Sequence, residues 1–209
     1  NTKRAFRRGL EKPVDLRAKI RENQQQALEL LIEKGGEGSE IKALWREFKA
    51  DYFLRYAPEQ IVWHCQHILI QDRDKPMVLI SPKPYRGGTE VFVFTKDKAN
   101  IFANIVSMLG AKCFSIHDAK IITSKTGYTA NTFVILDQQG QPINDSYRAL
   151  ELAQSLIQVL TSTNPQISLK PPAKRLEQFN VPTQVSFVET KTHRSTLLEI
   201  VALDRPGLL

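Results

Sequence analysis

The sequence is poor in cysteine and contains no long apolar run. Its 209 residues include two cysteines, Cys65 and Cys113, which are too few for a disulfide framework and match no paired zinc-binding spacing. No apolar stretch approaches the roughly 20 residues that a membrane-spanning helix needs. The first eight residues are basic, lack the apolar core of a secretory signal and do not begin with Met. We therefore expect a protein of the reducing cytoplasm, without a membrane partner, whose N-terminus was cut from a longer chain.

Positive charge is in excess. Lysines and arginines number 29 against 22 acidic residues, which gives a net charge of +7. Such an excess can serve an acidic partner or a nucleic acid. Much of it lies in residues 3–21 and 170–175, which are expected to be helix surface and loop. A solvated face explains charge in such places more simply, and we expect no nucleic-acid partner.

Apolar spacing predicts three helices in the first 75 residues. The first spans residues 15–34 and ends at a pair of glycines, and the second spans residues 40–56. Pro58 opens the third, at a position where the missing N–H of proline costs nothing. The three apolar stripes can be buried against one another, so residues 1–75 are expected to form a helical segment.

After Pro76 the pattern changes to short strands rich in β-branched and aromatic residues. Strands are predicted at 77–80, 89–94, 113–123, 128–136 and 184–188, with helices at about 97–110, capped by Asp97, and 144–160. From residue 89 onward the order is β-α-β-β-α-β, the ferredoxin-like split unit. The predicted fold class is α+β: a helical segment, then a ferredoxin-like βαββαβ domain at 76–190 with a long linker before its last strand.

The strand-to-helix turn of this domain has a second copy near the end of the sequence. Residues 91–102 align with residues 198–209, and each copy is an apolar strand followed by Asp, a basic residue, two small or turn-forming residues and two apolar residues. We expect residues 191–209 to be the first strand and turn of a second, truncated domain.

The two turns form the candidate ligand site. A helix N-terminus has free backbone N–H groups and a partial positive charge, which suit a carboxylate. A nearby acidic side chain could meet an ammonium group or cap the helix, so the turn could hold the zwitterion of an amino acid. A purely structural capped turn explains the same spacing. The candidate residues are Asp97, Lys98, Ala99, Asn100 and Ile101 in the first copy, and Asp204, Arg205, Pro206, Gly207 and Leu208 in the second.

Asp-Arg-Pro-Gly-Leu-Leu at 204–209, placed after an apolar strand, resembles the opening of an ACT domain. ACT domains are small βαββαβ modules that commonly bind amino acids at interfaces between domains. The resemblance implies a first ACT domain at 76–190 and the start of a second at 191–209, with ACT–ACT pairing within or between chains. In the first copy, Ala99 and Asn100 stand where Pro206 and Gly207 stand in the second.

Longer stretches resemble the family of bifunctional uridylyltransferase/uridylyl-removing enzymes, which modify the PII nitrogen-signalling protein of proteobacteria. The matching stretches are residues 1–10, 75–82, 86–90 and 116–119, followed by Gly127 and 132–134. The resemblance implies a parent enzyme with a nucleotidyltransferase domain, an HD-type phosphohydrolase domain and two ACT domains that sense glutamine. L-glutamine would be the effector, PII the parent's substrate and Mg²⁺ the parent's cofactor. Residues 1–75 would follow or complete the HD-type domain.

Neither the family's Gly-Ser turn with paired acidic metal ligands nor its His-Asp metal cluster occurs in this sequence. We therefore expect no catalytic residue, metal or cofactor in the chain itself. His64 and His67 lie one helical turn apart, but a zinc site needs three or four ligands. The neighbouring strand residues His117 and Asp118 should point to opposite faces, and no nucleophile accompanies them.

Two alternatives to amino-acid sensing remain open. One is a protein-interaction module that docks PII or another subunit without binding an amino acid. The other is RNA binding, because RNA readers with the same βαββαβ order stack bases on strand aromatics. Phe92 and Phe94 share a strand face but have few basic neighbours, which favours packing in a core.

Overall fold

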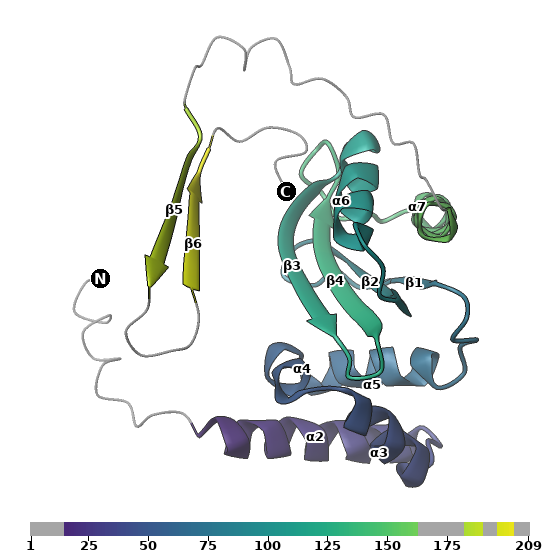
Figure 1. Ribbon diagram of the computed structural model, residues 1–209. Helices are drawn as coiled ribbons and strands as arrows, with labels where there is room; N and C mark the ends of the chain where they lie inside the picture. The colour runs from purple at the N-terminus through teal and green to yellow at the C-terminus, as the bar shows by residue number, and fades with distance from the viewer. Residues whose placement is uncertain (1–14, 163–181, 190–195, 203–209) are drawn as a thin grey trace, which may run out of the picture.

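The computed structural model describes residues 15–162, 182–189 and 196–202 (Figure 1). The helices are α2 (Leu16–Glu33), α3 (Gly38–Glu47), α4 (Ala50–Arg55), α5 (Pro58–Ile68), α6 (Ile101–Ala111) and α7 (Ser146–Thr161). The strands are β1 (Met77–Ile80), β2 (Thr89–Lys96), β3 (Ser115–Thr123), β4 (Tyr128–Leu136), β5 (Gln184–Glu189) and β6 (Thr196–Val201). The predicted α+β class, with a helical segment first, is confirmed. None of the described helices combines the length and the apolar content that crossing a membrane requires.

The helical segment has a break that its apolar spacing does not predict. The helix expected at 40–56 is interrupted because Phe48 and Lys49 have extended backbone, with ψ angles of 153° and 168°. The buried ring of Phe48, at the break, stacks on that of Tyr52 in α4 with 4.3 Å between their centroids. Both rings belong to the buried cluster that the helices share with the sheet, so tertiary packing overrides the local helical pattern.

A buried amide ties α2 to the junction of α4 and α5. The Nδ2 of Asn23 donates hydrogen bonds to the backbone oxygens of Phe53 and Tyr56, at 2.7 and 3.4 Å. These oxygens lie at the C-terminal end of α4, where a helix leaves carbonyl groups without partners. The next helix begins at Pro58, as predicted. The free carbonyl groups at the end of α4 therefore accept hydrogen bonds from a side chain of α2.

Four antiparallel strands form one sheet in the order β1-β2-β4-β3. The succession β2-α6-β3-β4-α7 follows the predicted order. The strand predicted at 184–188 is present as β5, but it pairs with β6 in a separate two-stranded sheet. The edge position beside β2, where the last strand of the split unit was expected, is held by β1. Only residues 81–88 separate β1 from β2, so closing that pair costs less chain entropy than pairing β2 with β5.

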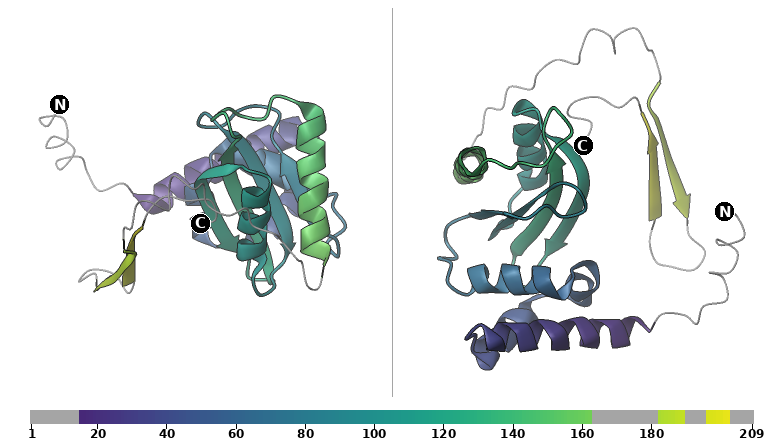
Figure 2. Two further views of the ribbon diagram at one scale, coloured as in Figure 1. Left: turned by 90° about the horizontal axis from the view of Figure 1, so that it is seen from above. Right: turned by 180° about the vertical axis from the view of Figure 1, so that it is seen from behind.

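The two faces of the four-stranded sheet belong to two hydrophobic clusters. On one face, strand residues pack with α6 and α7; they are Val78, Val91, Val93, Phe133 and Ile135. On the other face, which we call the α5 face, strand residues share a cluster with α2, α3, α4 and α5; they are Met77, Phe92, Phe94, Ile122 and Ala130. Figures 1 and 2 show α5 lying between the sheet and α2. The residues on either side of Pro76 therefore share one continuous core.

Candidate functional site

The predicted ligand-binding turn lies between β2 and α6 on the surface. Residues 97–100 are exposed, and Ile101 is buried as the first residue of α6. The strand and helix that flank the turn are anchored in the α6–α7 cluster through Val93 and Ile105. The fold thus presents the turn to solvent on a rigid base.

Asp97 does not cap α6, contrary to the prediction. The N-cap residue is Asn100, and its side chain makes no capping hydrogen bond. Its backbone is left-handed, with φ of +65°. Asparagine tolerates this conformation better than most residues with a side chain, and glycine tolerates it best. In the aligned second copy the residue at this position is Gly207. Because it does not cap the helix, the exposed Asp97 carboxylate remains available to a ligand.

A hydrogen bond links this turn to the β3–β4 hairpin. The backbone N–H of Asp97 donates to the backbone oxygen of Gly127 at 2.8 Å. Gly127 belongs to the tip of the hairpin, residues 124–127, and has φ of +78°. Beside it, the Lys96 ammonium forms an ion pair with Asp74 at 2.7 Å. The turn is therefore bonded to the hairpin tip, and the residue before the turn is paired with the segment that follows α5.

The hairpin tip in turn docks on the C-terminal end of α3. The backbone N–H of Lys125 donates to the backbone oxygen of Glu47 at 2.7 Å, and the Thr126 hydroxyl donates to the Glu47 carboxylate at 2.7 Å. The Nζ of Lys125 also donates to the backbone oxygen of Arg46 at 2.9 Å. Figure 1 shows the hairpin reaching the helical segment. We call this set of contacts the hairpin clamp.

The Glu47 carboxylate is the centre of the hairpin clamp. Arg73 donates a hydrogen bond to the same oxygen that accepts from Thr126, at 2.8 Å. Partial burial alone would raise the pKa of Glu47, but the hydrogen bonds from Arg73 and Thr126 hold it below its ordinary value. The Arg73 guanidinium also lies 5.5 Å above the ring of Tyr128. The clamp is therefore charged at neutral pH and is built from three separate parts of the chain.

Aromatic rings fill the joint between α4, α5 and the sheet. His64 is fully buried and stacks on Phe92, with 3.7 Å between ring centroids. Its Nδ1 shares a hydrogen bond of 3.1 Å with the Tyr52 hydroxyl. Burial lowers the pKa of His64 well below its ordinary value, and the charges of Lys120 and His67 act in the same direction. His64 is thus a neutral member of the core.

Polar residues cross the same joint. The Tyr56 hydroxyl and the Thr132 hydroxyl lie 2.8 Å apart in a hydrogen bond. Gln60 of α5 donates through Nε2 to the carboxylate of Glu90 on β2, which is 4% exposed. Burial raises the pKa of Glu90, against the effect of the Gln60 hydrogen bond and of the Lys120 charge. Helix and sheet are therefore joined by specific polar bonds as well as by apolar contact.

A lysine ammonium lies beside these groups. The Nζ of Lys120 is buried and has no hydrogen-bond partner among the described residues. It lies 4.8 Å from the ring centroid of Tyr56 and 5.4 Å from that of Tyr85. Burial lowers the pKa of Lys120, and the carboxylates of Asp118 and Glu90 oppose that effect. Two aromatic faces thus take the place of the missing hydrogen bonds.

The remaining sequence patterns are structural in the described part of the chain. His67 bonds through Nδ1 to the backbone oxygen of Trp63 at 2.7 Å, apart from the buried His64. Asp118 forms a 3.7 Å ion pair with Arg86, at a register shift of β3 next to the exposed His117. No group of His, Cys, Asp or Glu side chains that could hold a metal ion occurs among residues 15–162, 182–189 and 196–202.

Sequence patterns did not identify the residues of the joint or of the hairpin clamp. Their contacts join residues that are 12 to 79 positions apart, so no short-range spacing in the sequence predicts them. One signal was present: Glu90 shares a strand face with Phe92 and Phe94, where an acidic residue is out of place. The second candidate turn, Asp204 to Leu208, lies outside the described residues.

Comparison with known proteins identifies relatives along the whole chain. A family model for the fifth domain of the uridylyltransferase GlnD matches residues 15–67. The bifunctional uridylyltransferase/uridylyl-removing enzyme of Vibrio vulnificus (strain YJ016) is 50% identical over 212 residues, which cover 100% of this chain and 24% of that protein. The enzymes of the same name from Vibrio cholerae and Photobacterium profundum are 50% and 47% identical, with the same coverage.

The resemblance to the bifunctional uridylyltransferase/uridylyl-removing enzymes is therefore confirmed over the full length of the chain. The chain spans about a quarter of the length of these curated relatives. No solved structure matches it.

Proposed function

We propose that this chain is a regulatory, glutamine-sensing region of an enzyme that uridylylates the PII protein and removes the uridylyl group again. The observation that carries the proposal is the similarity to such enzymes from the first residue to the last. The chain corresponds to a quarter of their length, so the two catalytic activities would belong to the rest of the protein. The helical segment 1–75 would connect that part to a first ACT domain at 76–190 and to the start of a second at 191–209.

In this proposal the turn at 97–101 receives the amino acid. The exposed Asp97 carboxylate would bind the α-ammonium group, and the backbone N–H groups at the start of α6 would bind the α-carboxylate. Lys98, Ala99, Asn100 and Ile101 would supply the backbone around it. Residues 204–208 would form the equivalent turn of the second ACT domain, where Gly207 leaves more room for a ligand than Asn100 does.

The hairpin clamp offers a route from this turn to the helical segment. A ligand changes activity elsewhere only if it binds more tightly to one arrangement of the protein than to another. The Asp97 N–H is bonded to Gly127, and the same hairpin tip is bonded to Glu47 of α3. A ligand that moves the turn would therefore strain or relax the contact with α3. The shared core on the α5 face would make the helices and the sheet move together.

The experiment is an L-glutamine titration of the complete enzyme by calorimetry, paired with an assay of both activities. We expect binding, and a shift of the balance towards uridylyl removal. Replacement of Asp97 by Asn should weaken binding at the first turn about tenfold, the effect of losing one charge-assisted hydrogen bond. Asp204→Asn tests the second turn in the same way.

Asp51→Asn is the matched control, because Asp51 is an exposed carboxylate of α4 distant in sequence from both turns. It should leave the affinity unchanged. Absence of heat with the intact enzyme would overturn the sensing proposal. Binding of PII or of a second subunit that ignores glutamine would favour the alternative, a pure interaction module.

A further inference from the structure

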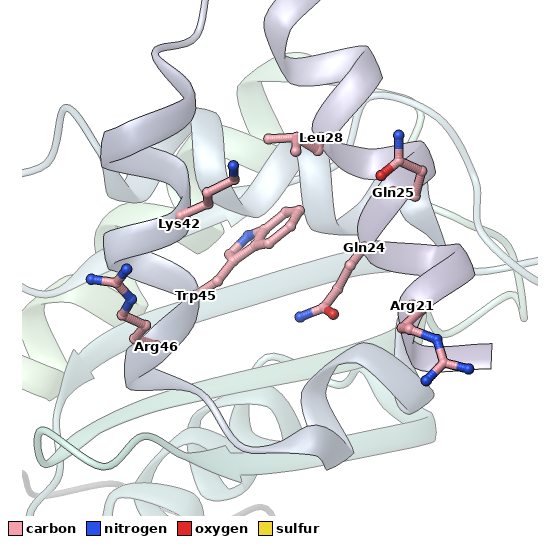
Figure 3. Close-up of a pocket in the computed structure, with 7 residues that line it drawn as sticks. All are labelled: Arg21, Gln24, Gln25, Leu28, Lys42, Trp45 and Arg46. Carbon is pink, nitrogen blue, oxygen red and sulfur yellow. The ribbon is translucent and has the colours of Figure 1, made fainter. Parts of the chain in front are cut away.

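An open groove lies between α2 and α3 of the helical segment (Figure 3). Its volume is about 490 Å³. Seven residues line it: Arg21, Gln24, Gln25 and Leu28 from α2, and Lys42, Trp45 and Arg46 from α3. Figure 3 shows the side chains of the two helices on opposite sides of the gap, with the indole of Trp45 reaching across it.

The groove is positively charged and its charges are not neutralised. Arg21, Lys42 and Arg46 are exposed, and none of their side chains forms an ion pair or hydrogen bond with the described residues. None of the seven lining residues is acidic. By contrast, the nearby Lys19 is paired with Glu22 at 2.9 Å. Three unpaired cations around one hollow favour an anionic occupant.

The floor of the groove indicates which kind of anion fits. Trp45 is only 8% exposed, and its Nε1 already donates to the Sγ of Cys65 at 3.1 Å. The edge-on contact of its ring with Phe53, at 5.4 Å between centroids, occupies the indole further. A nucleotide base would therefore find no free aromatic face on which to stack, which is how proteins commonly hold bases.

The remaining lining residues suit a polypeptide. Leu28 is half-buried and offers an apolar contact, while the side-chain amide of Gln24 can donate to and accept from a peptide backbone. The Nε2 of Gln25 already donates to the Glu29 carboxylate at 2.6 Å, which leaves its amide oxygen as an acceptor. Lys42 and Arg46 are one helical turn apart on the same side of α3, with Arg21 opposite on α2. This places cations on both sides of an apolar and amide-lined floor.

We propose that the groove between α2 and α3 binds an acidic segment of a partner protein. Carboxylates of the segment pair with Arg21, Lys42 and Arg46, and its backbone lies over Leu28 and the edge of Trp45. This site is separate from the turn at 97–101 and does not depend on glutamine sensing. Because the ion pairs are exposed, the affinity is modest and falls as salt is added.

The test uses the full chain and a fluorescein-labelled peptide of ten glutamates, with binding followed by anisotropy in low and moderate salt. The variant Lys42→Gln/Arg46→Gln should bind about tenfold more weakly, because it removes two exposed ion pairs that each contribute about threefold in affinity. The matched control is Lys34→Gln/Lys83→Gln, which removes the same charge from exposed positions outside the groove. It should change the affinity less than twofold.

A second readout keeps the proposal testable if a variant folds poorly. Hydrogen exchange of the unaltered chain with the peptide should slow around residues 21–28 and 42–46 and leave β3 and α7 unaffected. Equal loss of binding in both double variants would mean attraction by net charge alone and would overturn the proposal. Displacement of the peptide by low concentrations of UTP or of single-stranded RNA would also overturn it, in favour of a nucleotide site.

Discussion

The two faces of the four-stranded sheet are covered in different ways. The face towards α6 and α7 packs Val91, Val93 and Phe133 against leucines and isoleucines of those helices. The buried side-chain hydrogen bonds of this face stay within the sheet and the loop before α7, from Thr129 to Asn131 and from the Ile143 N–H to Thr89. The α5 face has buried bonds between the sheet and the helical segment, since Tyr56 bonds to Thr132 and Gln60 bonds to Glu90. The face towards α6 and α7 is the hydrophobic core that a sheet covered by helices needs. The second is a fitted joint between the sheet and a helical segment that precedes it in the chain.

The difference indicates what each face can do. Apolar packing tolerates many arrangements of similar volume, whereas buried hydrogen bonds are satisfied in one arrangement only and are costly to leave unmade. The polar bonds of the α5 face therefore fix how the helices sit on the sheet. A fixed joint is what a signal passing from the sheet to the helices would require.

The largest effects should come from removing one ring on each face. Phe92 and Phe133 are both fully buried, so replacing either by Ala should lower the free energy of unfolding by about 3 to 5 kcal/mol. Denaturant unfolding measures these losses. The comparison of faces predicts that hydrogen exchange quickens mainly in α4 and α5 for Phe92→Ala, and mainly in α6 and α7 for Phe133→Ala.

Identical exchange patterns in the two variants would break that comparison. The sheet and all its helices would then unfold as one unit, and the α5 face would have no separate role. Phe102→Ala is a useful reference, because its ring stacks on Phe133 at 5.9 Å but is 38% exposed. Its removal should cost less than that of either buried ring.

The sequence predicted the apolar parts of this structure well. Phe92 and Phe94 were predicted to pack in a core because they share a strand face with few basic neighbours, and the structure confirms this. Pro58 marked the start of α5 correctly. Such features follow from local periodicity and backbone chemistry. This confirmation also removes the support for RNA binding through the sheet, because the two rings are covered by the helical segment.

Features set by distant contacts were not predictable in the same way. The break between α3 and α4 after Glu47 depends on how the rings of Phe48 and Tyr52 pack in the core. No proline or glycine in the sequence marks its position. The position of the candidate turn was read from the sequence, but Asp97 was wrongly expected to cap α6. The left-handed backbone of Asn100 moves the helix start beyond its reach.

After the two ring substitutions, the next largest predicted effect is on the pH dependence of the free energy of unfolding, and it comes from a residue of the α5 face. Burial holds the pKa of His64 well below its ordinary value. In the unfolded chain this imidazole binds a proton near pH 6.5, whereas in the folded chain it stays neutral at that pH. Stability should therefore fall as the pH drops below about 6.5, with a slope of up to roughly 1.4 kcal/mol per pH unit from this residue. Denaturant unfolding between pH 5 and 7.5 measures the slope.

Replacement of His64 by Gln should remove that part of the slope, whatever it does to the stability at pH 7.5. His117→Gln is the matched control, since His117 is exposed, and it should leave the slope nearly unchanged. The same slope in all three proteins would mean that His64 becomes protonated within the folded joint, and the joint would then be less closed than its geometry indicates.

The smallest effect isolates a single bond of the joint. Tyr56→Phe removes the hydroxyl that bonds to Thr132 and should lower the free energy of unfolding by about 1 kcal/mol. The loss of stability is slightly larger if the Thr132 hydroxyl then stays unpaired. Tyr147→Phe is the control, because Tyr147 is 74% exposed, and it should have no measurable effect.

A double-mutant cycle with Thr132→Val separates the bond from other losses, and the coupling energy should be near 1 kcal/mol. Since a purely apolar joint would give a coupling near zero, that result would make the two faces of the sheet equivalent, and the α5 face could no longer be credited with fixing the helices in place.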